Sequence, residues 1–522
     1  MREVPSEKQI GRKPGGRLLD GLIIAMLTVV SFAMQYRSGA YRSDLTLDPD
    51  EPAHAVSSLM VRDYLAQDFP HNPVCFASDF YAHYPKVAIG HWPPLFHAAE
   101  AAWMIVLGRT RIAMLLFVAL TGSALLASIY LQVRHYASIS AALLPVGMLI
   151  ASGVMQQMFS AVRPDLLLAL LVFWAGVFCS RFVFLSDRKA LWWFLGLGVA
   201  AILAHGRGAM LLFVPFCLMI LARRATNWKW AIAFGLVLLL LPLPYLLGQA
   251  DPLNLHSILT INRLFVMRMG FTLGWFPLVL ALVGSVGALR PGDHQPFWAA
   301  MLSLAISAWV FQVLVPIRWD DRLMVTALPA VAALAGNGVY VLRSRFSNAS
   351  RGRRRCWDAA VALCVLLAAA WGLEHAERKP DLNYHQLIAN CILCESKVAL
   401  IAADGLNEGA FIAEQSLADP ARSHTILRGS KVLAHSTWAG RRYQMLFATD
   451  DALAAYLEKS GVSLVLVQRG DGVPQHVIQL RRTLTTARQW VLVPQSTVTT
   501  VEIFRELSSQ QAPALESQRF SP

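Results

Sequence analysis

The sequence predicts a polytopic α-helical membrane protein with about eleven transmembrane helices, followed by a soluble C-terminal α/β domain. Long apolar runs recur up to about residue 373, and 56% of the 522 residues are hydrophobic while 15% are charged. The mean hydropathy of +0.46 lies well above that of a soluble domain. We therefore expect an N-terminal segment 1–17, a transmembrane domain 18–375 with a large first outer loop 37–110, and an α/β domain 376–522.

Each predicted span is an apolar run near the ~20 residues that cross the hydrocarbon core of a bilayer. In chain order, the predicted spans are residues 18–36, 111–131, 137–156, 164–185, 190–205, 207–222, 228–248, 271–290, 296–315, 323–342 and 357–373. The shorter run 93–108 carries His97 and Glu100, so we expect a re-entrant or interfacial helix there. No clear small-residue cleavage site follows the first run, which favours a retained span over a removed signal peptide.

The chain has a net charge of +13, and its basic residues concentrate at the ends of the apolar runs. Arginine and lysine cluster in segments 12–17, 222–229 and 343–355, as in loops that stay on the cytoplasmic side. With a cytoplasmic N-terminus, most acids between the spans fall on the opposite side. This predicts an integral inner-membrane protein whose C-terminal domain is extracytoplasmic, like the first loop. A nucleic-acid-binding protein would gather its cations on one face of a soluble fold, so nucleic acid is not an expected partner.

The C-terminal residues alternate between short apolar runs and helical patterns. Residues 397–404, 462–470, 490–496 and 500–507 are typical of strands, with helices expected at 406–418, 451–460 and 476–487. Segment 404–410 lacks the spacing of a glycine-rich phosphate fingerprint. Cys391 and Cys394 form a C-x-x-C with no second pair, so we expect a local disulfide rather than a zinc site.

A group of carboxylates follows the first predicted span. Asp48, Asp50 and Glu51 precede Pro52 and the start of a helical pattern. Acids at a helix N-terminus are favoured by capping and by the helix dipole, which is the structural interpretation. Here they crowd the exit of a span, and other polar groups are expected on the same membrane face. That concentration indicates a site.

Further polar groups occur at the outer ends of other spans. They are His83, Lys86, His91 and His97 around a double proline; Arg163 and Asp165; His256 in the loop 249–270; and Arg318, Asp320, Asp321 and Arg322. For each set a structural account stays open: an interfacial hinge, a helix-capping ion pair, a solvated loop, or internal pairing of charges. The functional interpretation is that lysine, histidine and arginine side chains at headgroup depth bind a lipid phosphate.

Four short motifs then occur in a fixed order. They are Asp50–Glu51, Pro93–Pro94–Leu95, Pro164–Asp165, and Arg322 before a span that contains Pro329. In this order and spacing the set resembles the GT-C membrane glycosyltransferases, nearest the protein O-mannosyltransferase and lipid A aminoarabinose transferase relatives. The resemblance covers roughly residues 18–345. The chain departs from the aminoarabinose branch at Trp92, where that branch has a lysine directly before Pro-Pro-Leu.

The resemblance implies a GT-C-like catalytic domain that moves a sugar from a polyprenyl-phosphate donor to an acceptor hydroxyl on the extracytoplasmic face. By this likeness Asp50 is the general base, with Glu51 and Asp165 as further catalytic acids. The donor phosphate is assigned to Lys86, His91, Arg318 and Arg322, and further site contacts to His54, Arg163 and His256. Some relatives use a divalent cation to bridge acids and phosphate; no other cofactor is expected.

Two other classes of function stay open. A transporter or flippase for a lipid-linked sugar would more often show internal repeats and polar or broken segments near the midplane. The charges here lie at span ends, which favours chemistry at the membrane surface. The other class is a non-catalytic envelope-assembly subunit. If the protein were such a subunit, an Asp50→Asn change would leave its biological function intact.

Overall fold

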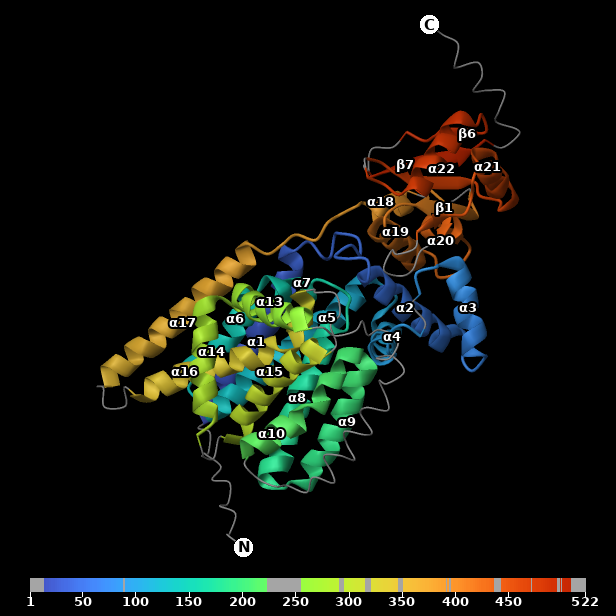
Figure 1. The fold of residues 1–522 in the computed structure, drawn as a ribbon. Helices are drawn as coiled ribbons and strands as arrows, with labels where there is room; N and C mark the ends of the chain where they lie inside the picture. Colours follow the sequence, from blue (N-terminus) through green and yellow to red (C-terminus); the bar gives the residue numbers. More distant parts are fainter. Residues whose placement is uncertain are drawn as a thin grey trace.

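In the computed structural model, the described residues are 14–87, 90–222, 255–290, 295–314, 321–345, 351–390, 392–393, 396–435, 443–470, 472–494, 498 and 500–507. Figure 1 shows a bundle of long helices and a smaller body built around a β-sheet. A connector after the last bundle helix leads to the smaller body, and the helices of the first loop lie beside it.

The bundle consists of apolar helices of unequal length. They are α1 (Pro14–Arg37), α5 (Arg111–Tyr136), α6 (Ile139–Ala151), α7 (Gly153–Phe159), α8 (Asp165–Leu185), α9 (Arg188–Ala204), α10 (Val214–Ala222), α13 (Leu255–Leu273), α14 (Trp275–Ala288), α15 (Gln295–Leu314), α16 (Leu328–Arg345) and α17 (Arg351–Glu374). Over the described part of the chain, five helices are long and apolar enough to cross a membrane, or up to seven if each bent pair counts once. The five lie in α1, α5, α8, α15 and α17.

Two predicted spans are broken by sharp bends. The run 137–156 divides into α6 and α7, which meet at 74° at Ser152; the Ser152 side chain caps α7 by accepting the backbone N–H of Met155. The run 271–290 bends by 111° at Gly274, whose φ of +88° favours glycine. The part of segment 249–270 that is described belongs to α13, so the loop predicted there is wrong. The predicted span 228–248 lies outside the described residues.

Two other predicted spans start with tighter turns. The short 3₁₀ helix η2 (Gly206–Leu212) precedes α10, and η3 (Asp321–Thr326) precedes α16. Such segments place side chains differently from a regular α-helix. Both carry arginines that belong to the site described below.

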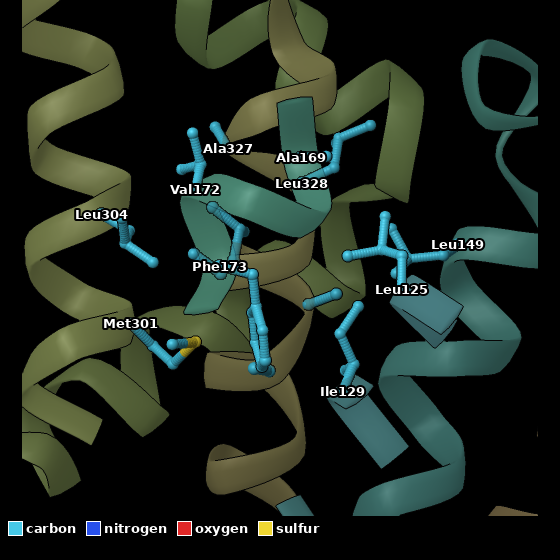
Figure 2. Close-up of a cluster of buried hydrophobic side chains, with 14 of the residues drawn as sticks. Leu125, Ile129, Leu149, Ala169, Val172, Phe173, Met301, Leu304, Ala327 and Leu328 are labelled. Atoms are coloured by element: carbon cyan, nitrogen blue, oxygen red, sulfur yellow. The ribbon is translucent and has the colours of Figure 1, made fainter. Parts of the chain in front are cut away.

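The core of the bundle is a continuous apolar cluster. Figure 2 shows Phe173 of α8 among side chains from α5, α15 and the start of α16. Glycines bring α14 and α16 into close contact: a Cβ on Gly284 would lie 1.8 Å from the Leu334 carbonyl oxygen, and one on Gly338 would lie 2.1 Å from that of Leu280. Small residues permit this close packing of apolar helices.

The first loop forms helices of its own. They are α2 (Glu51–Asp63), the short π-helical turn η1 (Tyr64–Asp68), α3 (Pro73–His83) and α4 (Leu95–Leu107). At 13 residues, α4 is shorter than the ~20 residues of a regular span. Trp92, Pro93 and Pro94 lead into it, and Pro94 takes its N-cap position.

The smaller body contains a mixed five-stranded sheet in the order β2-β1-β5-β7-β6. The strands β1 (Val398–Ala402), β2 (Thr425–Arg428) and β5 (Leu464–Gln468) are parallel, whereas β7 (Val501–Glu506) pairs antiparallel with β5 and with β6 (Trp490–Leu492). A separate two-stranded sheet pairs β3 (Ala434–His435) with β4 (Gln444–Met445). The helices are α18 (Tyr384–Ala389), α19 (Gly405–Ala418), α20 (Gly429–Val432), α21 (Asp450–Lys459) and α22 (Gln475–Thr486).

One face of this sheet shares a hydrophobic core with the first loop. Because strand side chains alternate between faces, Ala399 and Ile401 join a cluster that contains Val56 and Leu59 of α2. Leu400 and Ala402 join a second cluster on the opposite face. The sheet is therefore packed on both sides.

Polar contacts fix this junction. Arg109 forms hydrogen bonds to both Asp63 carboxylate oxygens at 3.0–3.2 Å and donates to the Leu417 carbonyl at 2.8 Å. Arg111 pairs with Glu414 of α19, whose Oε1 accepts the backbone N–H of Leu45 at 3.1 Å. The segment before α2 and the end of α2 are thus tied to the sheet body.

Candidate active site

The segment before α2 is arranged so that Asp50 stands at the helix start. Asp48 Oδ1 accepts the backbone N–H groups of Asp50 at 2.9 Å and Glu51 at 3.0 Å. Pro52 occupies the first turn, where its missing N–H costs nothing. Asp48 is thus the acid that accepts these bonds, and the Asp50 side chain makes no cap hydrogen bond. The Asp50 carboxylate is left for other contacts.

Two arginines from distant segments meet Asp50. Arg322 Nη1 in η3 donates to Asp50 Oδ2 at 2.7 Å and lies 3.5 Å from Asp48 Oδ2. Arg163 Nη2 lies 3.5 Å from Asp50 Oδ2, and its Nη1 pairs with Asp48. Three segments far apart in sequence thus bring their charges to one place.

A buried pair supports this cluster from behind. Arg207 Nη2 in η2 donates to Asp165 Oδ1 at 2.7 Å, and Arg163 Nε lies 3.3 Å from Asp165 Oδ2. Arg207 Nη1 also donates to the backbone carbonyl of Arg322 at 3.0 Å. Asp50 and Asp165 share Arg163, and Arg207 fixes the backbone that carries Arg322.

Exposure divides the six charged residues into two sets. Asp48, Asp50 and Arg322 keep 28%, 19% and 22% of their side-chain surface accessible, whereas Arg163, Asp165 and Arg207 keep 3%, 1% and 5%. A substrate can therefore reach the first three. The buried three are paired with opposite charge, as buried ions in proteins are, and they position the outer set.

Burial also sets the proton affinity of Asp50. It raises the pKa of the Asp50 carboxyl above its usual value, against the opposing effect of the Arg163 guanidinium. The neighbouring Asp48 carboxylate raises the pKa further. Asp50 consequently binds a proton more readily than a free aspartate, as a general base must.

Glu51 is bonded differently from its neighbour. Its fully buried carboxylate accepts hydrogen bonds from Lys379 Nζ at 2.5 Å, from the Val162 N–H at 3.1 Å and from the Leu47 N–H at 2.8 Å. Lys379 Nζ also donates to the Ser160 carbonyl at 3.5 Å. These contacts tie α2 to the segment before α8 and to the connector after α17.

Lys86 approaches the cluster from the junction with the sheet body. Its Nζ donates to the Gly405 carbonyl at 3.3 Å, and 8% of the residue is exposed. Burial lowers the pKa of Lys86 to about 8, and Arg428 acts in the same direction. Glu408, Asp50 and Asp48 act in the opposite direction, so the ammonium group lies within the field of the site acids.

The histidines form a partly apolar wall beside α2. His54 Nδ1 lies 3.2 Å from His97 Nε2, and the His54 ring stacks on Trp92 with centroids 3.9 Å apart. Burial holds the pKa of His54 well below its usual value, so the ring is neutral at physiological pH. Burial also lowers the pKa of half-buried His91, against the effect of Asp50.

Two residues predicted for the site are not placed beside it. Arg318 lies outside the described residues, and His256 falls in α13 at a position whose side chain is outside them. The structure brings together Asp50, Asp165, Arg163 and Arg322, with Lys86 at the edge. Glu51 points into the buried ion pair with Lys379 instead.

Sequence reasoning missed Arg207 and Lys379. Arg207 is the first residue of the predicted span 207–222, on the side predicted to be outer for Asp165 as well, and a lone cation there was the available signal. Lys379 follows the last predicted span, and its bond to Glu51 joins residues 328 positions apart. No sequence pattern indicates a contact at that separation.

The site acids are paired with arginines rather than arranged for a metal. Over the described residues, the metal-type group of acids and histidine is Asp44, Asp381 and His385, with ligand atoms within 4.8 Å of one another. There Asp44 accepts the backbone N–H groups of Tyr384 and His385, which accounts for the arrangement. Around Asp50, guanidinium groups contact Asp50 Oδ2, Asp48 Oδ2 and both Asp165 oxygens. Among the described residues, these acids are therefore arranged as ion pairs with arginines and do not form a metal-type group.

Comparison with known proteins identifies a shared fold. The chain is similar to crystal structures of ArnT from Cupriavidus metallidurans, bound to undecaprenyl phosphate (TM-score 0.57, 15% identity) and in the apo state (TM-score 0.60, 14% identity). Each match covers 95% of this chain and 98% of ArnT. No protein-family profile and no curated protein sequence matches.

The expected resemblance is therefore confirmed at the level of the fold. ArnT is the lipid A aminoarabinose transferase and has the GT-C fold. The shared architecture extends over nearly the whole of both chains. At 14–15% identity, the likeness concerns the fold, and the chemistry depends on the residues of the site.

Proposed function

We propose that this protein is an integral membrane glycosyltransferase that moves a sugar from a polyprenyl-phosphate donor to an acceptor hydroxyl on the extracytoplasmic face. The observation that carries the proposal is the partly exposed Asp50 carboxylate, 2.7 Å from Arg322 and backed by the buried Asp165–Arg207 pair. A proton acceptor and a phosphate-binding cation stand side by side. The fold is that of ArnT, one structure of which is bound to undecaprenyl phosphate.

In the proposed reaction, the acceptor oxygen attacks the anomeric carbon while the bond from that carbon to the donor phosphate oxygen breaks. The acceptor proton moves to Asp50, and the polyprenyl phosphate leaves with the bonding electron pair. Sugar transfer of this kind develops positive charge on the ring and negative charge on the leaving group. Arg322 and Lys86 stabilise the leaving phosphate by charge-assisted hydrogen bonds.

The pairing of Arg322 with Asp50 links donor binding to base strength. An arriving phosphate competes for the Arg322 guanidinium, which in the free protein contacts both Asp50 and Asp48. As the phosphate takes over that guanidinium, Asp50 loses a neighbour that favours its charged form, and its pKa rises further. The base is thus strengthened when the donor is present.

The remaining site residues hold this arrangement. Arg163 and Asp165 orient Asp50 through shared ion pairs, and Glu51 anchors the start of α2 through Lys379. His54 is neutral and lies against His97, so we assign it to shaping the wall beside the acceptor rather than to binding phosphate. We propose the same extracytoplasmic side for the sheet body, which packs against the first loop.

The test is turnover by purified full-length protein with a panel of polyprenyl-phosphate sugars. Asp50→Asn is expected to lower kcat by about 10²–10⁴-fold, the usual contribution of a general base, while the melting temperature stays near that of the wild type. Asp451→Asn serves as the matched control, because Asp451 is exposed in the first turn of α21. It should retain full activity.

The pH dependence of kcat/KM is a second test of Asp50 as the general base. For the wild type, kcat/KM should fall as pH falls through the Asp50 pKa, which burial holds above the usual aspartate value. Unchanged turnover in Asp50→Asn would reject Asp50 as the base. Absence of turnover with every donor would reject the transferase assignment in favour of a transporter or an assembly subunit.

A further inference from the structure

A cationic cavity lies at the end of α1, separate from the Asp50 cluster. Its volume is about 350 Å³, and it is lined by residues 36–39, 41–43, 378 and 379. Four of these are cations, Arg37, Arg42, Arg378 and Lys379, and none of the lining residues in the described chain is acidic. A concave surface of this size falls within the range of ligand sites in proteins.

The walls of the cavity are fixed by hydrogen bonds. The Lys379 backbone N–H donates to the Ser38 carbonyl at 2.8 Å, and Ser43 Oγ donates to the Lys379 carbonyl at 3.3 Å. Ser160 Oγ donates to Ser38 Oγ at 2.7 Å, which joins this wall to the segment before α8. The turn after α1 and the connector after α17 therefore form one rigid rim.

Three of the cations are available to a ligand. The Lys379 ammonium is consumed by Glu51 on the far side, but Arg37, Arg42 and Arg378 are exposed. Within the described residues, none of the three arginines forms an ion pair with an acid. Arg42 lies over the Tyr36 ring, 6.0 Å from its centroid, a cation–π contact that holds the guanidinium at the rim.

The two acids next to lining residues in the sequence, Asp44 and Glu377, do not neutralise this surface, because Asp44 is buried and pairs with His385. Glu377 is outside the lining and accepts a hydrogen bond from Gln157 of α7. On the proposed topology the cavity also lies on the extracytoplasmic side, where membrane proteins carry few cations near span ends. A group of unpaired arginines there is therefore not explained by insertion signals. It needs an anion.

We propose that this cavity binds the phosphate headgroup of an anionic membrane lipid. Arginine presents a planar fork of donors that matches phosphate oxygens, and three such forks surround the cavity. Tyr36 is 66% exposed beside them at the end of an apolar helix, where its ring meets the lipid interface. The lipid chains then run along α1 while the phosphate lies between the arginines.

The experiment measures binding of short-chain phosphatidic acid to purified full-length protein in detergent by thermophoresis. Phosphatidylcholine of the same chain length and inorganic phosphate are the comparison probes. Phosphatidic acid should bind at least about tenfold more tightly than phosphatidylcholine, and added salt should weaken it through screening. The combined Arg37→Ala, Arg42→Ala and Arg378→Ala variant should lose at least about tenfold in affinity.

Two control variants separate this site from others. Arg188→Ala removes an exposed arginine at the start of α9, beyond the opposite end of α8 from Asp165, and should bind like the wild type. Asp50→Asn should also bind normally, so the outcome does not depend on the proposed transferase activity. Because the three cavity arginines are exposed, their loss should leave the unliganded melting temperature unchanged.

Equal affinity of the wild type and the triple variant for phosphatidic acid would overturn the proposal. Inorganic phosphate that binds as tightly as the lipid, and competes with it, would assign the cavity to free phosphate and overturn the lipid assignment. Loss of phosphatidic acid binding in Asp50→Asn but not in the triple variant would place the lipid at the Asp50 cluster instead.

Discussion

Replacing Glu51 by glutamine removes the negative charge that faces Lys379 in the protein interior. Both side chains are fully buried and their charged atoms are 2.5 Å apart. Removing one partner of a buried ion pair leaves the other charge uncompensated, at a cost of about 3–5 kcal/mol. The glutamine amide also cannot accept every N–H that Glu51 accepts from Leu47 and Val162. We expect Glu51→Gln to lose about 3–5 kcal/mol of unfolding free energy.

The assay is unfolding of the purified protein by sodium dodecyl sulfate in mixed micelles, followed by tryptophan fluorescence. Adding Lys379→Met to Glu51→Gln should recover part of the loss, because no buried charge then remains. A loss below about 1 kcal/mol in Glu51→Gln, with no recovery in the double variant, would refute this reasoning. If turnover then fell while stability held, Glu51 would regain the catalytic role that the family resemblance implies.

Three further predictions concern the junction and the donor site. The KM for the donor should rise as pH rises through about 8, since Lys86 then loses its positive charge; in Lys86→Gln, KM should be high at pH 7 and show no such rise. Gly409→Ala should destabilise the protein by about 1–3 kcal/mol in the same unfolding assay, because the added Cβ would lie 2.8 Å from both Lys86 Cε and Pro52 Cγ. An unfolding curve that matches the wild type would contradict this, because it would show that the residues around Gly409 can shift to accept the added Cβ. Arg207→Met should leave Asp165 without its 2.7 Å partner and release the backbone of η3, which raises the donor KM more than it lowers kcat; a kcat-only effect would contradict this positioning role.

The parts of the site that could be predicted are those at a common membrane depth. Asp165, Arg163 and Arg322 lie at the starts of predicted spans and Asp50 lies in the loop after the first span; a bilayer forces span ends on one side to the same level. That constraint makes residues far apart in sequence neighbours. A common membrane depth does not specify which charged residues pair with each other. The ion pair of Glu51 with Lys379 and that of Arg207 with Asp165 therefore became evident only from the structure.

The errors in the bundle have a physical cause as well. Hydropathy averages over about 20 residues, whereas the breaks at Ser152 and Gly274 depend on one cap and one positive φ angle. In the sheet body, the strands expected at 397–404, 462–470, 490–496 and 500–507 correspond to β1, β5, β6 and β7. These strands could be predicted because a short apolar run between two turns is visible in the local sequence. The four-residue strand β2 and the two-residue strands β3 and β4 were not predicted, since runs this short show little alternation.

The shared core of the first loop and the sheet body has a consequence for biosynthesis. Val56 and Leu59 leave the ribosome some 340 residues before Ala399, with which they pack in the finished protein. At about 5–20 residues per second, translation takes roughly 20–70 s to supply that partner. During this interval the part of the apolar surface of α2 that packs on the sheet body stays uncovered, and a chaperone that acts on the emerging loop would bind there.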